Sequence, residues 1–223
     1  MFFRDRTHAG QLLAAQLSHY ANDPDLLVCA LPRGGVVVGF EVAEVLNAPL
    51  DVLIVRKLGV PGQEELAMGA ISSGGIRILR DDVIETCGIS PKLIEAVTAK
   101  EKRELERRER LYRGHAAPLQ IQGRTVILVD DGIATGSTML AAATAVRQKQ
   151  PKRLVIAVPV APPSACLELE SQAEEFVCLA QPELFLALGY HYEDFRQVSD
   201  DEVRGLLQRA AKRVAGRAIS MHA

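Results

Sequence analysis

The chain has 223 residues, so we expect one large domain that carries an insertion rather than two full domains. Hydrophobic residues make up 48% and charged residues 24%, which excludes a disordered chain, and the formal charge of -2 removes the electrostatic case for nucleic-acid binding. The apolar runs are too short to span a membrane and the N-terminus lacks a signal-peptide stretch, so we expect a cytoplasmic protein without a membrane partner.

Apolar segments alternate with turns and helical patterns along most of the chain. A first helix is predicted over 7–20, with Thr7 as its N-cap, and further helices at 36–47, 137–148 and 163–172. The apolar runs that predict strands are 26–31, 51–59, 126–129, 153–161 and 175–181. Continuous apolar strands that alternate with helices indicate an α/β fold, a parallel central sheet flanked by helices.

The pattern changes between about residues 60 and 120, where we expect the insertion. Residues 65–79 alternate loosely around Gly74-Gly75, which predicts an antiparallel hairpin. A long helix is predicted over 91–113, because Ser90 is a good N-cap and Pro91 suits the first helical position. Its dense charges are typical of a solvated face, and the alternative is an anion-binding or partner-binding role.

The segment 126–138, VILVDDGIATGST, carries the strongest functional signal. Asp130 and Asp131 directly follow a buried strand, and ligands of parallel sheets bind beyond the carboxyl ends of the strands. The next residues offer small side chains, hydroxyls and free backbone N–H groups at a helix N-terminus, which suits a phosphate. These residues are Ala134, Thr135, Gly136, Ser137 and Thr138. A ribose diol beside its own phosphate would satisfy both groups, whereas an ordinary strand and turn would explain neither.

This segment resembles the phosphoribosyl pyrophosphate (PRPP) motif of the type I phosphoribosyltransferase family at every position. The resemblance implies that family's fold, PRPP and Mg²⁺ as ligands, and a nucleobase-like acceptor. It also implies that Asp130 and Asp131 hold the ribose hydroxyls, that Thr135 to Thr138 hold the 5-phosphate, and that Mg²⁺ is held mainly through PRPP. No G-K-[ST] occurs in the chain, which disfavours a P-loop nucleoside triphosphatase.

A second element of the same resemblance is LPRGG, Leu31 to Gly35, after the first core strand. The family places there the loop that grips pyrophosphate, and the resemblance implies a cis peptide bond between Leu31 and Arg33. Arg33 offers a charged fork, and Gly34 and Gly35 let the backbone approach a phosphate closely. The alternatives are a plain turn and a dinucleotide-binding turn, the second disfavoured because the pattern is not G-x-G-x-x-G.

Arg56 and Lys57 end the second predicted strand and precede LGVPGQEE, a composition that favours a mobile loop. The resemblance implies that these two basic residues reach over the leaving pyrophosphate and exclude water. The alternative is that they are ordinary surface charges.

The C-terminal region, about 182–223, resembles the hood of purine phosphoribosyltransferases. The candidates implied there are Phe185 or Leu186 for stacking on a base, Glu193 or Asp194 for assisting magnesium, and Arg196 for contacting pyrophosphate. The alternative is a hairpin and a helix that cover the sheet edge. Ala134 stands where transferases of 6-oxopurines carry a third acid, which favours an adenine-like, uracil-like or unusual acceptor.

Neither the cysteines nor the histidines predict a metal site made by the protein. The four cysteines form no C-x-x-C pair, and the histidines show no metal-ligand spacing. The histidines are His8, His19, His115, His191 and His222.

Two functions from different classes follow from the resemblance. The first is an enzyme that uses PRPP and Mg²⁺ to attach a 5-phosphoribosyl group to a nitrogenous base and releases pyrophosphate. The alternative is a non-catalytic PRPP-sensing regulatory module, and either could form a homodimer. A sensor would not need Arg33, Arg56 or Lys57, so their presence favours the enzyme.

Overall fold

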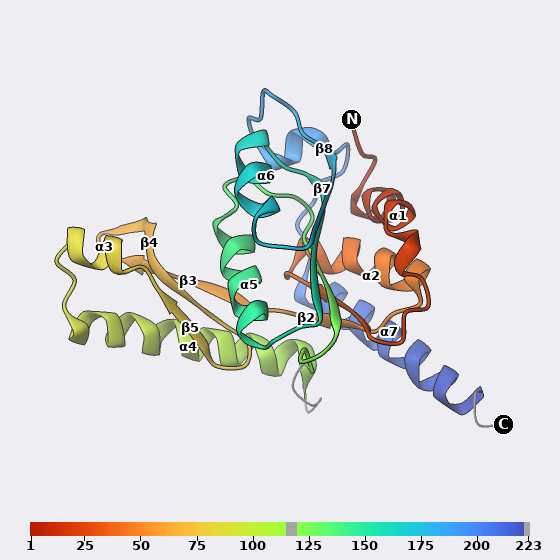
Figure 1. The fold of residues 1–223 in the computed structure, drawn as a ribbon, viewed down its shortest axis with the longest axis horizontal. Helices are drawn as coiled ribbons and strands as arrows, with labels where there is room; N and C mark the ends of the chain where they lie inside the picture. The colour runs from red at the N-terminus through yellow and green to blue at the C-terminus, as the bar shows by residue number, and fades with distance from the viewer. Residues whose placement is uncertain (115–119, 221–223) are drawn as a thin grey trace.

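A computed structural model describes residues 1–114 and 120–220, apart from the side chains of Glu65, Ala215 and 217–220. Its centre is a five-stranded sheet in which all neighbours run parallel, in the order β2-β1-β6-β7-β8 (Figure 1). The strands are β1 (Leu26–Ala30), β2 (Leu50–Val52), β6 (Thr125–Val129), β7 (Arg153–Val160) and β8 (Glu175–Ala180). This sheet confirms the predicted α/β class.

Helices cover both faces of the parallel sheet (Figure 1). The helices α1 (Arg6–Gln16) and α2 (Gly34–Leu46) pack on one face, and α5 (Ser137–Gln148) and α6 (Pro163–Glu170) pack on the other. Alternate residues of β6 serve the two cores, so that Ile127 packs with the first pair of helices and Leu128 with the second. Because both faces are buried, the strands read as continuous apolar runs.

The first helix is displaced from its predicted position, which corrects the sequence analysis. It begins at Arg6 and ends at Gln16, and a separate 3-10 turn follows at Ser18–Tyr20. The N-cap is Asp5 rather than Thr7, because the Asp5 Oδ1 accepts the amide N–H of His8 at 2.8 Å. The shift places Arg6 in the first turn of the helix.

The predicted strand 51–59 is two strands in two different sheets, which is a second correction. The edge strand β2 ends at Val52, and Val55–Val60 form β3 of a separate antiparallel sheet with the order β3-β4-β5. Between them, the Ile54 amide donates to Ser73 Oγ at 3.1 Å and the Ile54 carbonyl accepts from the Ser73 amide. Arg56 and Lys57 therefore lie inside β3 and do not end a parallel strand.

The stretch after Lys57 is a hairpin and not an irregular loop. Strand β4 (Gln63–Ser72) pairs with β3, and Gly62 turns the chain with a positive φ of 81°. Strand β5 (Ile76–Leu79) pairs with β4, which confirms the hairpin predicted around Gly74-Gly75.

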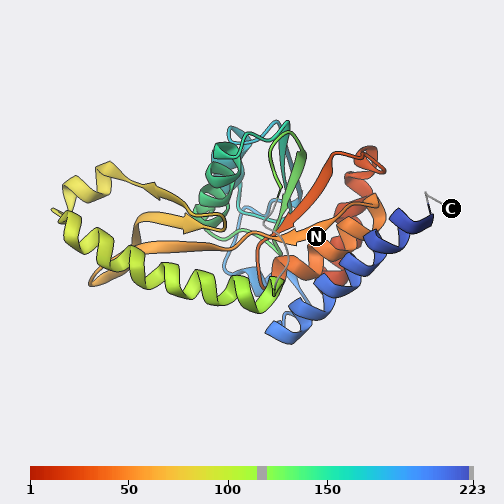
Figure 2. The same ribbon diagram turned by 90° about the horizontal axis from the view of Figure 1, so that it is seen from below.

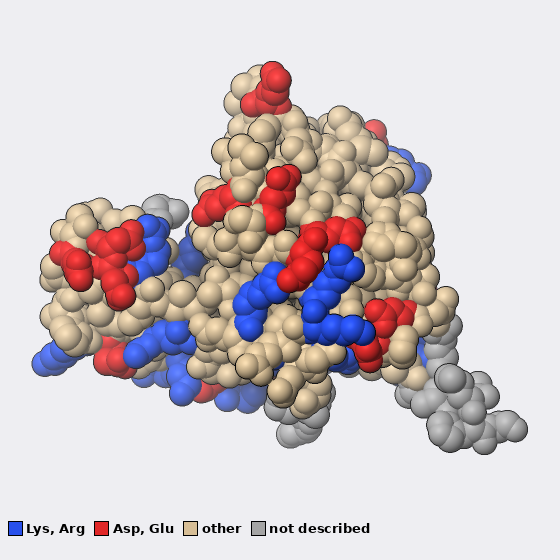
Figure 3. Space-filling view, viewed as in Figure 1, with Lys and Arg blue, Asp and Glu red and all other residues tan. Residues whose placement is uncertain are grey.

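The small sheet and two helices form an arm that projects from the parallel sheet (Figures 1 and 2). These helices are α3 (Asp81–Thr86) and α4 (Pro91–Arg113), and the second confirms the predicted helix and its Ser90 cap. Figure 3 shows acidic and basic side chains interspersed along this arm and on the face beside it. Three buried side chains of α4 share one hydrophobic core with the small sheet, and they are Ile94, Leu105 and Tyr112.

The C-terminal part of the chain packs against the N-terminal residues. Residues 181–199, here called the hood segment, contain a 3-10 turn at Leu188–His191, and Tyr192 in this segment bridges to Phe3. The last helix, α7 (Asp200–Ser220), packs against α2 and α4. Among the described helices, none combines the length and the apolar character that a membrane crossing requires.

Candidate functional site

Two adjacent carboxylates lie at the carboxyl end of β6. Asp131 is buried, and its Oδ2 accepts a hydrogen bond from the Arg6 Nε at 2.6 Å. The Oδ1 of Asp130 accepts the amide N–H of Asp131 at 2.8 Å. Burial of the Asp130 carboxyl group, and next the charge of Asp131, raise the pKa of Asp130 above its ordinary value. The pair therefore combines one carboxylate neutralised by an arginine with one whose ionised form is costly.

The loop after the acids leaves a run of backbone donors free. The Ile133 amide donates to the Val160 carbonyl, and the Leu140 amide donates to the Gly136 carbonyl. Between these two, the amides of 134–139 have no acceptor among the described residues. Gly136 has a positive φ of 78° and caps α5, so these amides belong to the loop and to the first turn of the helix. Such donors, with the positive end of the helix dipole, suit a phosphate.

The hydroxyl groups of the same loop lie beside these amides. Thr135 Oγ1 and Ser137 Oγ are 3.1 Å apart, and Thr135 is exposed. The structure thus places the predicted phosphate-binding residues in one continuous turn directly after the acids.

The loop that follows β1 touches the two acids. A Cβ atom added to Gly34 would lie 1.9 Å from the Asp131 Oδ2, and one added to Gly35 would lie 2.9 Å from the Asp130 Oδ1. Both glycines are therefore required by close approach to the carboxylates. The peptide bond between Pro32 and Arg33 is cis, within the interval that the resemblance implied.

Arg33 lies at the N-terminus of α2 and is half-buried. Within the described part of the chain it has no ion-pair partner. It lies near Tyr112 of α4, whose pKa is raised to about 12 by burial and by its hydrogen bond to Asp200, while the charge of Arg33 opposes that rise. Arg33 is thus a partly buried cation whose charge no described carboxylate neutralises.

The arm brings more cations toward the turn that is predicted to bind phosphate, Ala134 to Thr138. A cavity of about 420 Å³ is lined by Arg56 and Lys57 of β3, by Lys100 and Glu101 of α4, and by Thr138 of α5. Arg56 is engaged there, because Glu101 Oε2 accepts from its Nη2 at 2.6 Å and from its Nε at 2.9 Å. Lys57 and Lys100 are exposed, and neither has an ion-pair partner among the residues that the structure describes.

The hood segment packs on the motif through Leu188. A Cβ atom added to Gly132 would lie 2.2 Å from the Leu188 Cδ1, so the glycine makes room for the hood. Phe185 stacks on His191 with ring centroids 5.2 Å apart, whereas Leu186 is 69% exposed. Of the two candidates for stacking on a base, Leu186 is the one whose side chain is open to solvent.

The backbone of the hood segment and the side chain of Arg196 bind other parts of the protein. The amide groups of Glu193 and Asp194 donate to the carbonyls of Phe3 and Arg4. The Arg196 guanidinium pairs with Glu202 of α7 at 2.8 Å. In this arrangement Arg196 is held by α7.

The fold and these loops match known proteins. Residues 6–183 match a family model described as the phosphoribosyl transferase domain. The chain belongs to this family. Two provisionally named phosphoribosyl transferases, from two strains of Mycobacterium tuberculosis, are each 46% identical over 208 residues, which is 93% of this chain and 47% of theirs. The chain therefore spans about half the length of the curated relatives it matches.

A solved structure is similar over almost its whole length. The crystal structure of TT1426 from Thermus thermophilus is 42% identical, with a TM-score of 0.83, and the match covers 94% of this chain and 99% of that one. Together with the family model, which names the phosphoribosyl transferase domain, this match confirms the fold predicted from the 126–138 motif.

Two features of the site are missing from the sequence analysis. Arg6 lies 125 positions before Asp131 in the chain, and nothing in the sequence around it signals this contact. Lys100 is one of many charges on α4, so its place in the cavity beside Thr138 follows only from the packing of the arm.

The histidines contribute no metal cluster in the part of the chain that the structure describes. No group of three or more His, Cys, Asp or Glu side chains is arranged there to hold a metal ion. His115 and His222 lie outside the described residues, and His191 packs on Phe185.

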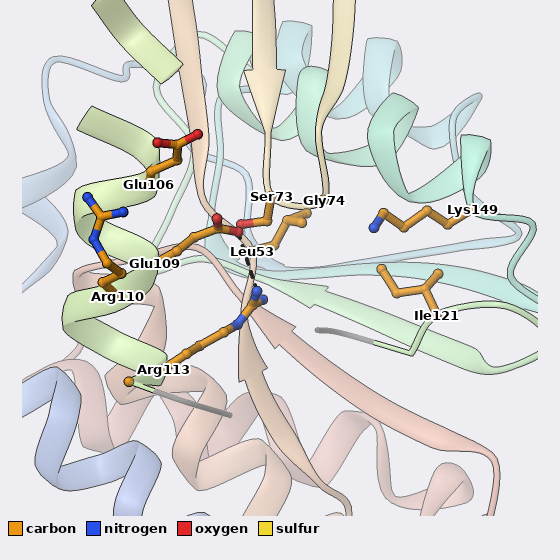
Figure 4. Close-up of a pocket in the computed structure, with 10 residues that line it drawn as sticks. Leu53, Ser73, Gly74, Glu106, Glu109, Arg110, Arg113, Ile121 and Lys149 are labelled. Atoms are coloured by element: carbon orange, nitrogen blue, oxygen red, sulfur yellow. Dashed lines mark hydrogen bonds and ion pairs between the residues drawn. The ribbon is translucent and has the colours of Figure 1, made fainter. Parts of the chain in front are cut away.

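Another cavity, of about 270 Å³, lies where the arm joins the sheet (Figure 4). Arg110 and Arg113 reach it from α4, and Lys149 from the end of α5. The Arg113 guanidinium forms ion pairs with Asp51 and with Glu109. None of the residues predicted for the functional site lines this cavity, so it is separate from the acids and the phosphate-binding turn.

Proposed function

We propose that this phosphoribosyl transferase domain binds PRPP with Mg²⁺ and transfers its 5-phosphoribosyl group to a nitrogenous base, releasing pyrophosphate. The observation that carries the proposal is the meeting of two loops, the one after β1 and the one after β6, at one edge of the sheet. Gly34 and Gly35 touch Asp130 and Asp131, and the free amides of 134–139 follow directly. In PRPP the ribose hydroxyls lie next to a phosphate, and in this site the carboxylate acceptors lie next to the backbone N–H donors.

In this proposal the contacts of the protein with the ribose and with its 5-phosphate hold the substrate in place. The ribose hydroxyls donate to the carboxylates of Asp130 and Asp131, in bonds strengthened by the negative charge. The 5-phosphate accepts from the amides of Ala134 to Thr138 and from the hydroxyls of Thr135, Ser137 and Thr138. Fixing both ends of the sugar orients the anomeric carbon for attack.

The departing pyrophosphate is stabilised by cations from two sides. Arg33 approaches from the loop after β1, and Lys57 and Lys100 approach across the cavity that Thr138 also lines. Arg56 joins them, and its pairing with Glu101 fixes its position. As the bond between the anomeric carbon and the pyrophosphate oxygen breaks, these charges balance the negative charge on the leaving group. The base nitrogen then forms the new bond to carbon, and its proton passes to the released pyrophosphate or to water.

The protein offers no cage for Mg²⁺ in its described residues, whereas a diphosphate offers hard oxygen ligands. Mg²⁺ therefore fits as an ion that enters with PRPP, and when bound it supplies charge neutralisation on the pyrophosphate.

The acceptor is proposed from what the site lacks. Ala134, which is exposed, provides no carboxylate for the proton of a 6-oxopurine. Leu186 offers an open apolar side chain for stacking. These two features support an adenine-like, uracil-like or unusual nitrogen heterocycle as the acceptor.

We also infer that residues 1–223 act as a single unit, with the arm as the insertion and the hood segment plus α7 as the hood. The regulatory alternative, a PRPP sensor, is disfavoured because Lys57 and Lys100 line the cavity beside Thr138 without a described carboxylate partner, and Arg33 has no such partner either. A homodimer and a cytoplasmic location remain predictions of this proposal.

The test is base-dependent release of pyrophosphate from PRPP in the presence of Mg²⁺. We expect release with at least one member of a panel of purines, pyrimidines and small nitrogen heterocycles. PRPP binding in a calorimeter with no release for any base would support the sensor instead. Absence of PRPP binding would contradict both.

A further inference from the structure

Arg6 is a buried charged side chain that joins three separate parts of the molecule. Only 10% of its side chain is exposed, and its Nε donates to the Asp131 Oδ2 at 2.6 Å, where 12% of the partner side chain is exposed. Its Nη1 donates to the carbonyl of Arg196 at 2.9 Å. Its guanidinium carbon lies 3.8 Å from the ring centroid of Phe195. One guanidinium thus connects α1, the acid pair and the hood segment.

The hood segment makes another contact with the same acid. The Tyr192 hydroxyl donates to the backbone carbonyl of Asp131 at 2.6 Å, and its ring lies 4.9 Å from the ring of Phe195. Phe195 in turn carries the Arg6 guanidinium on its face. The position of Asp131 is therefore fixed on its carboxylate and on its carbonyl by residues from opposite ends of the chain.

We propose that Arg6 is a positioning residue for PRPP, which holds the Asp131 carboxylate in place for a ribose hydroxyl and fixes the hood segment on the acid pair. This inference rests on the proposed function. The Arg6 bond uses only Oδ2, so that Oδ1 of Asp131 stays available to accept a ribose hydroxyl.

Arg6 supplies a positive charge beside two neighbouring buried acids, and this charge opposes the rise in the pKa of Asp130 that burial and Asp131 cause. Adjacent carboxylates in a buried position repel, and without a cation such a pair retains a proton at neutral pH. The charged or titratable groups acting on Asp130 and Asp131 are each other, Arg6 from α1 and Tyr192 from the hood segment. Of these, only Arg6 carries a positive charge.

The consequence is a pH-dependent defect when the charge of Arg6 is removed. A shared proton turns one acceptor of the pair into a donor, so a ribose hydroxyl loses its partner. Raising the pH removes that proton and restores the second acceptor. A purely structural role for Arg6 would weaken binding equally at every pH.

The experiment measures the Kd of PRPP with Mg²⁺ by calorimetry on the full chain between about pH 5.5 and pH 8.5. The variants are Arg6→Ala, Arg6→Gln, which keeps a neutral donor, and Arg6→Lys, which keeps the charge. The matched control is Arg4→Ala, because Arg4 is an exposed arginine of the same segment whose side chain has no ion-pair partner among the described residues.

We expect Arg6→Ala and Arg6→Gln to weaken binding about tenfold or more at the acidic end and less at the alkaline end, where each tenfold step is about 1.4 kcal/mol. Arg6→Lys keeps the charge but loses the bond to the Arg196 carbonyl and the stacking on Phe195, so its loss of affinity should be the same at every pH. Arg4→Ala should bind PRPP as the wild type does. If Arg6→Ala does not fold, the comparison of the Gln and Lys variants decides.

If the wild type binds PRPP, but the Gln and Lys variants bind it with equal affinity at every pH, only the role of Arg6 is overturned. A wild type that does not bind PRPP would instead contradict the proposed function. The two failures are thereby distinguishable.

Discussion

Gly34→Ala is the substitution whose effect follows most directly from the structure. The added Cβ would lie 1.9 Å from the Asp131 Oδ2, 2.5 Å from its Cγ and 2.8 Å from the Arg6 Nε. The clash is with a buried, hydrogen-bonded carboxylate, which has little room to move. Overpacking a rigid site costs about 1–3 kcal/mol, and loosening a buried ion pair adds to that cost.

The expected result is a fall of about 1–3 kcal/mol in the free energy of unfolding, together with loss of PRPP binding. Chemical denaturation gives the first and calorimetry the second. Gly205→Ala is the matched control, because nothing lies within 4 Å of a Cβ there and the residue is inside α7. That control should stabilise the helix by about 0.5–1 kcal/mol and leave PRPP binding unchanged. A Gly34→Ala protein with wild-type stability and wild-type affinity would refute the contact between the two loops.

Further expectations concern the charges of the site. Asp130→Asn should stabilise the protein at neutral pH and weaken PRPP binding. Folding raises the pKa of Asp130, so the stability of the wild type falls as the pH rises through that pKa. The gain in the free energy of unfolding, measured by denaturation, should therefore vanish in acid. Lys57→Ala and Lys100→Ala should each weaken binding of inorganic pyrophosphate and flatten its dependence on salt in calorimetry, and unchanged salt dependence would remove them from the site. Glu101→Gln should change the affinity for pyrophosphate by freeing Arg56, whereas an affinity equal to that of the wild type would show that their ion pair has no part in binding.

The core strands could be predicted because their signal is local. Each residue of β6 is buried, so an unbroken apolar run marks the strand, and the acids and small residues that follow it are contiguous in sequence. The Ser90 cap and the helix after it are likewise read from adjacent residues.

The errors arose where a distant contact decides the local structure. The run 51–59 reads as one strand, and only the pairing of Ile54 with Ser73 shows that the chain changes sheets there. Asp5 and Thr7 are both suitable caps, and their spacing alone does not choose between them. Arg6 meets an acid 125 positions away, and a single sequence carries no sign of such a pair.

A crystal structure of the protein with PRPP and Mg²⁺ tests the central claim most directly. We expect the ribose hydroxyls on Asp130 and Asp131, the 5-phosphate on the amides of 134–139, and the pyrophosphate beside Arg33 and Gly34. PRPP bound elsewhere, for example in the cavity beside Lys149, with the acids left in contact only with Arg6 and each other, would contradict it.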